Sequence, residues 1–123
     1  MTFAQLAATA AQVVAATQHR LPAPVRLLAG AVPVCYESRP ARAILDGSGE
    51  SDLLGLFIGS PHGEETGDHN DLPPQILLFL ENLYDYADGD PAIYRDEVRL
   101  TYLHELGHYL GWDEADLEAR GLD

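Results

Sequence analysis

The sequence predicts an α+β fold for a chain of 123 residues. Apolar residues recur at helical spacing in an N-terminal stretch and again in a long stretch near the C-terminus. Between these stretches lie three short apolar segments bounded by glycine, proline and polar residues, as is typical of strands. Because the strands follow one another and the helices lie on either side of them, the order favours an α+β arrangement. The length is that of one domain, which we expect to span residues 1–123.

The first predicted helix spans Thr2 to His19, and Leu21 and Pro22 end its pattern. Its apolar side chains fall at helical spacing on one face: Phe3, Leu6, Ala10, Val13, Val14 and Ala16. The stretch lacks a basic N-terminal region, and glutamines interrupt its apolar residues, so it does not have the pattern of a signal peptide. No apolar run approaches the length of a membrane span. We therefore expect a cytoplasmic protein without membrane contact.

Three strands are predicted in the middle of the chain. The first lies in VRLLAGAVPVCYE (residues 25–37), where Gly30 and Pro33 mark a bend or an edge position. The second is LLGLFIGS (residues 53–60), which is short, apolar and bounded by turn residues. The third is QILLFLENL (residues 75–83), whose end is expected to turn helical.

A long helix is predicted from Pro91 to Leu110. Asp90 is a suitable N-cap, proline is tolerated in the first turn, and Gly111 can take the left-handed conformation that ends a helix. A short terminal helix follows in EADLEARGL, with Asp113 placed to cap it and Asp116 three positions further on. The chain therefore ends in two consecutive helices.

The charge of the chain limits its partners. Twenty acidic residues against seven basic ones give a formal net charge of −13. Sequence-independent binding to nucleic acid needs Lys and Arg to replace condensed counterions, so nucleic acid is not an expected partner. Acidic residues gathered in a cleft would instead attract cations or basic substrates. Cys35 is the only cysteine, so no intramolecular disulfide is possible, and we expect this side chain to be a small buried hydrophobe.

The segment HELGH in the long helix has the spacing of a metal site. His104 and His108 are four residues apart, so a helix places their imidazoles one above the other on one face, where they can share an ion. Glu105 lies one step round the helix, beside the ion, where its carboxylate can hold a water. The alternative is a buried helix with satisfied polar groups. A chance H-E-x-x-H in a chain this short has a probability on the order of a few per thousand, which favours the metal.

A catalytic zinc needs a third protein ligand and one open position. The turn at Gly111 swings the chain back, so that an acidic residue soon after it can face the two histidines. Asp113 and Glu114 are the candidates, with Glu118 a distant third. Because Asp113 suits the helix cap, we predict that Glu114 is the ligand and keep Asp113 as the alternative. Zinc is the expected ion, although manganese or another divalent transition metal also suits these ligands.

The loop PHGEETGDHND (residues 61–71) is the other place where potential metal ligands gather. They are His62, Glu64, Glu65, Asp68, His69 and Asp71. No spacing among them fixes a coordination geometry, so a solvated loop beside the cleft is the favoured interpretation and a second ion the alternative.

With these motifs, TYLHELGHYLGWDE resembles the zincins, and most closely the small single-domain zincin-like metallopeptidases of bacteria with the pattern H-E-x-x-H-x-x-G-x-x-D/E. The order of the predicted elements is similar to that family from about residue 20 to the end. The resemblance implies a mixed sheet of about three to four strands that packs against an active-site helix and an N-terminal helix. It also implies His104, His108 and Glu114 as zinc ligands and Glu105 as general base. LLGLFIG would supply a rim strand that pairs with an extended peptide or protein substrate.

The function predicted on this basis is hydrolysis of peptide bonds, with a metal-activated water and Glu105 as the proton acceptor. The chain departs from the metzincins, because Met1 is its sole methionine and their methionine turn is absent. Two alternatives remain. One is a metal-binding regulatory or interaction domain with little or no catalysis. The other is a zincin-like endoribonuclease, which the net charge of −13 disfavours.

Overall fold

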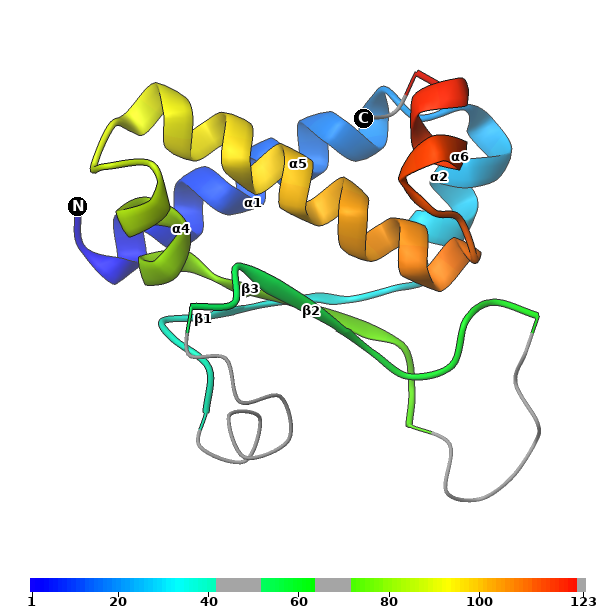
Figure 1. Cartoon of the computed structure of the whole chain (residues 1–123), viewed down its shortest axis with the longest axis horizontal. Helices are drawn as coiled ribbons and strands as arrows, with labels where there is room; N and C mark the ends of the chain where they lie inside the picture. Colours follow the sequence, from blue (N-terminus) through cyan, green and yellow to red (C-terminus); the bar gives the residue numbers. More distant parts are fainter. Residues whose placement is uncertain (42–51, 64–71, 122–123) are drawn as a thin grey trace.

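The computed structural model describes residues 1–41, 52–63 and 72–121 (Figure 1). The elements in chain order are α1 (Phe3–His19), α2 (Ala23–Gly30), β1 (Val34–Glu37), β2 (Gly55–Ile58), β3 (Gln75–Phe79), α4 (Leu80–Tyr86), α5 (Pro91–Leu110) and α6 (Glu114–Ala119). This arrangement confirms the predicted α+β class. Most of the loop considered for a second ion, including Glu64, Glu65, Asp68, His69 and Asp71, lies outside the described residues.

The three strands form a mixed sheet in the order β1-β3-β2. β1 runs parallel to β3, with Val34 opposite Ile76, and β2 runs antiparallel to β3, with Phe57 opposite the same residue. β3 lies at the centre and carries the most buried side chains of the three strands. β2 is thus an edge strand, as the resemblance to zincins implied.

The helices cover one face of the sheet, and α5 crosses above it with α1 alongside (Figure 1). The Tyr94 hydroxyl on α5 donates to the Leu6 carbonyl oxygen on α1 at 2.9 Å. The Gln18 side-chain amide donates to the Tyr102 hydroxyl at 2.9 Å. Both tyrosines are fully buried, so these bonds satisfy polar groups inside the core and fix α5 along α1. Within the described part of the chain, none of the helices has the length and apolar character needed to cross a bilayer.

Most predicted boundaries are confirmed. Thr2 and Gln5 form a capping box at the start of α1. Asp90 is the N-cap of α5, and its side chain accepts from the backbone N–H groups of Ala92 and Ile93. The third strand does turn helical at its end, where α4 begins directly after β3.

The prediction for residues 25–37 was only partly right. The strand is present at Val34–Glu37, but the residues before it form the helix α2. Pro24 lies in the first turn of α2, where the missing N–H costs no hydrogen bond. The helix is only eight residues long, too short for helical periodicity to outweigh the alternation around Val32 and Val34.

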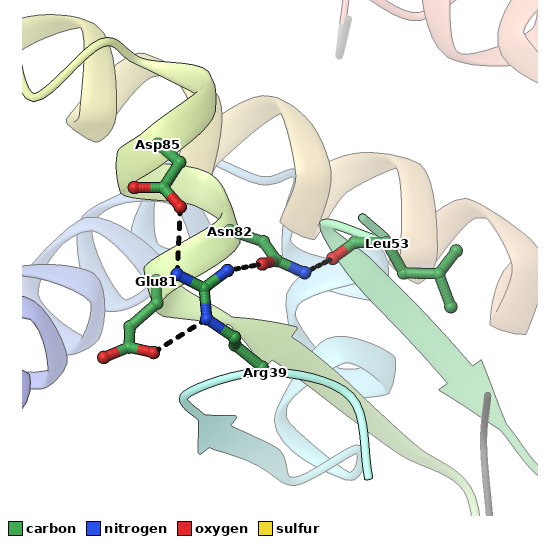
Figure 2. Close-up of polar contacts among 5 residues, drawn as sticks. All are labelled: Arg39, Leu53, Glu81, Asn82 and Asp85. Carbon is green, nitrogen blue, oxygen red and sulfur yellow. Dashed lines mark hydrogen bonds and ion pairs between the residues drawn. The ribbon is translucent and has the colours of Figure 1, made fainter. Parts of the chain in front are cut away.

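A polar network anchored by Arg39 fixes the approach to β2 (Figure 2). The Arg39 guanidinium contacts Glu81 at 3.1 Å and Asp85 at 3.0 Å, and it donates to the Asn82 side-chain oxygen at 2.6 Å. The Asn82 amide then donates to the Leu53 carbonyl oxygen at 2.9 Å. Asn82 is buried, and its bond to the Leu53 carbonyl oxygen holds Leu53, two residues before β2, against α4.

Gly55 lets α5 approach β2 closely. A Cβ atom at this position would lie 2.7 Å from the Thr101 side chain on α5 and 3.1 Å from the Leu77 carbonyl oxygen. Two residues further along the same face of β2, the Phe57 ring packs at 5.9 Å from the ring of Tyr109. β2 is therefore packed directly against the half of α5 that carries HELGH.

Candidate metal centre

Helical spacing brings the three polar side chains of HELGH together on α5. Candidate ligand atoms of His104, Glu105 and His108 all lie within 4.8 Å of one another. The two imidazole rings are 4.9 Å apart between centroids and nearly perpendicular, at 85°. The His104 side chain is 45% exposed and His108 is also open to solvent, whereas Glu105 is buried.

These donors fit a divalent ion of the zinc type. Nitrogen and oxygen donors lie about 2.0–2.2 Å from zinc, so two donors on one ion are at most about 4.4 Å apart. The ligand atoms of the two imidazoles lie within 4.8 Å of each other, close to this separation. Two imidazoles with a carboxylate also form a donor set that zinc and other divalent transition metals accept.

Glu105 lies in an environment that favours proton uptake. Only 8% of the residue is exposed, and this burial raises the pKa of its carboxyl group. His108, His104 and a hydrogen bond from the Phe57 backbone N–H act in the opposite direction and stabilise the ionised form. The carboxylate is therefore held between the imidazoles and the edge strand, with its affinity for a proton increased.

The turn after α5 returns the chain to this centre. Gly111 has φ 74°, and the Trp112 N–H donates to the Gly107 carbonyl oxygen at 2.8 Å. A Cβ atom at Gly107 would meet both Leu117 and the Trp112 carbonyl oxygen at 3.2 Å. The absence of a side chain at Gly107 therefore lets the buried Leu117 of α6 pack on α5.

Glu114 lies one turn before Leu117, on the side of α6 that faces α5. Its carboxylate oxygen Oε1 is 3.5 Å from Nδ1 of His104, and its side chain is 85% exposed. The structure does not include Glu114 in the three-residue cluster. It brings the carboxylate to the edge of the cluster, against one of the two histidines.

Asp113 has a different position. Its carboxylate accepts from the Asp116 N–H at 2.8 Å, and the Asp116 carboxylate accepts from the Asp113 N–H at 3.0 Å. This capping box confirms the predicted role of Asp113 at the start of α6. Of the two acidic residues considered as third ligand, Glu114 is the one that contacts a histidine. Its role as a ligand stays a prediction.

A groove of about 500 Å³ opens beside the cluster, which is within the range of small-ligand pockets. It lies between the start of β2, α5 and α6, and it is lined by Leu53, Leu54, Gly55, Leu100, Thr101, Leu103, His104, Glu105, Glu114, Leu117 and Glu118. Five of the eleven lining residues are leucines, and the three glutamates come from α5 and α6. An apolar side chain of a bound molecule can therefore lie next to the candidate metal ligands.

The contribution of the Phe57 backbone N–H to the site is not predictable from the sequence, because a backbone N–H carries no residue signature. The Tyr102 hydroxyl points away, to Gln18. The Tyr109 hydroxyl lies 3.3 Å from the ring atom Nδ1 of His62. The backbone N–H of His62 donates to the Tyr109 carbonyl oxygen at 2.6 Å. These two bonds attach the segment after β2 to the end of α5.

Comparison with protein families gives one finding. A family model described as Zincin-like metallopeptidase matches residues 29–122, which include HELGH, β1, β2, β3 and the helices α4 to α6. Among curated proteins no match was found.

Proposed function

Because the chain belongs to the zincin-like metallopeptidase family, we propose that it is a zinc-dependent peptidase that cleaves peptide bonds in extended segments. The observation that carries this proposal is the buried Glu105 carboxylate, which lies within 4.8 Å of two histidine side chains and beside an edge strand. His104 and His108 would hold the ion, with Glu114 as the third ligand. Zinc bound there would lower the pKa of a water molecule and polarise the scissile carbonyl group.

Glu105 is the proposed general base. Its carboxylate accepts a proton from the attacking water and then donates this proton to the leaving amine, so the same oxygen acts first as base and then as acid. The raised pKa of the buried carboxyl group supports this role, because it makes the carboxylate a stronger base.

The proposed substrate is a polypeptide in extended conformation, paired with β2. The Leu54 carbonyl oxygen accepts a hydrogen bond from the backbone N–H of Phe79 at 3.0 Å. Because bonding alternates along an antiparallel pair, the backbone groups of Leu56 and Ile58 also point to β3, and those of Gly55 and Phe57 point away from it. Because the Phe57 N–H donates to Glu105, an added strand would bond to the Gly55 backbone groups and the Phe57 carbonyl oxygen, and it would lie beside Glu105. The leucine-rich groove would then accept a side chain near the cleaved bond.

Replacing Glu114 and Asp113 one at a time tests which of the two carboxylates is the third zinc ligand. Glu114→Gln is expected to weaken zinc binding by about tenfold or more, because a neutral amide is a much poorer zinc donor. Asp113→Asn is the matched control, since asparagine caps helices as well as aspartate does and the variant keeps α6. Zinc affinity is measured by competition with a chelating dye. If Asp113→Asn loses the metal and Glu114→Gln keeps it, the assignment is reversed.

The reaction itself is tested by incubating the zinc-loaded protein with a mixed peptide library, with casein and with a fluorescent single-stranded RNA. We expect cleavage of peptides or casein and an intact RNA, because the chain carries a net charge of −13. Cleavage of RNA alone would favour an endoribonuclease. Tight zinc binding without turnover of any of the three would favour a metal-binding domain without catalysis.

A further inference from the structure

A second cavity of about 380 Å³ lies on the other side of α5, against α1. Its lining comes from the second half of α1 with the residues after it, from α5 and from the segment after α6. The lining residues are Val13, Ala16, Thr17, Arg20, Leu21, Arg95, Asp96, Arg99, Leu103 and Gly121. Three arginines thus border one cavity in a chain that has only seven basic residues.

The charge of this lining is opposite to that of the whole protein. Three arginines and Asp96 are the charged residues of the lining, so its formal charge is positive, although the chain carries a net charge of −13. Arg95 and Arg99 are one turn apart on α5, so their like charges repel each other. Arg39 and Arg120 form ion pairs, but among the described residues no ion pair involves Arg20, Arg95 or Arg99. Within the part of the chain that the structure describes, their donors therefore remain available to an anion.

The floor of the cavity is apolar. Val13, Leu21 and Leu103 are buried, and the Thr17 hydroxyl donates to the Val13 carbonyl oxygen at 2.7 Å. Hydrogen-bond donors are therefore concentrated at the guanidinium groups, whose planar geometry matches two oxygens of a carboxylate or a phosphate. We propose that this cavity binds a small organic anion, in which a carboxylate or phosphate group meets the arginines and a short apolar body covers the leucine floor.

Leu103 lines both cavities and immediately precedes His104. An anion bound in the second cavity therefore contacts a residue that also borders the groove of the metal centre. Binding of the anion does not depend on the proposed peptidase activity, since none of the candidate metal ligands lines the second cavity.

The test is calorimetric titration of the full chain with phenyl phosphate, benzoate and the neutral analogue benzyl alcohol. We expect one-site binding of phenyl phosphate or benzoate, and the preferred one of the two identifies the anionic group. Arg95→Gln combined with Arg99→Gln is expected to weaken binding by at least about tenfold, because charge-assisted hydrogen bonds are lost. Arg26→Gln on α2 removes the same charge outside the cavity and is expected to leave the affinity within about twofold.

Thermal melts check that each variant is folded. Should the double variant fail to fold, Arg20→Gln, on a different element, makes the same test. Three outcomes would overturn the proposal: no binding of either anion, equal binding of benzyl alcohol, or an equal loss of affinity in Arg26→Gln. The last outcome would mean that only the overall charge of the protein attracts the anion.

Discussion

Glu105→Gln is expected to slow peptide hydrolysis by about 10²- to 10⁴-fold while the protein keeps its zinc. An amide has the shape of the carboxylate but cannot accept the proton of the attacking water. The two imidazoles are unchanged, and a neutral side chain is tolerated at a site where burial already disfavours the charged form. The measurement is kcat/KM for a peptide cleaved by the wild type, with zinc content determined on the same samples.

The matched control is Glu37→Gln at the exposed end of β1, which removes the same charge away from the metal centre and is expected to retain full activity. Equal loss in both variants would point to the net charge of the protein rather than to proton transfer. A zinc-loaded Glu105→Gln protein that hydrolyses the peptide as fast as the wild type would show that another group is the base.

His108→Ala is expected to reduce zinc affinity by more than about 100-fold, since loss of an orienting partner of a ligand already costs about 10- to 100-fold. His108 lies in the last turn of α5 and is open to solvent, so its truncation leaves the core packing in place. Elemental analysis of protein purified without chelator gives the metal content, and dye competition gives the affinity.

His19→Ala is the control for this variant, because His19 is in the last turn of α1 and has no place in the cluster. It is expected to keep the zinc content of the wild type. A full equivalent of zinc in His108→Ala would mean that the ion is bound elsewhere, and both the metal centre and the proposed mechanism would then fail.

The geometry of HELGH was predictable because it depends on local structure. The separation of His104 and His108 by four residues fixes their common face in any helix, and Asp90 and Gly111 mark where that helix begins and ends. The capping box of Asp113 with Asp116 is local as well. All of these features need only neighbouring residues, so sequence patterns suffice to predict them.

The remainder of the site comes from contacts between distant parts of the chain. The hydrogen bond from Phe57 to Glu105 joins residues 48 positions apart, and no periodicity indicates it. The position of Glu114 against His104 likewise depends on how Leu117 packs over Gly107. α2 was missed because a helix of eight residues whose stability comes from tertiary packing leaves a weak local pattern.

Gly55 has a consequence for the reactive centre, although it has no chemical group to contribute. The Thr101 side chain occupies the volume that a methyl group at position 55 would fill, so the gap between β2 and α5 is too narrow for one additional carbon atom. The Phe57 N–H and the Glu105 carboxylate meet across this same clearance. Any side chain at position 55 would act as a wedge between strand and helix. The position of the proton acceptor is thus fixed in part by a residue of the edge strand that contributes no side chain.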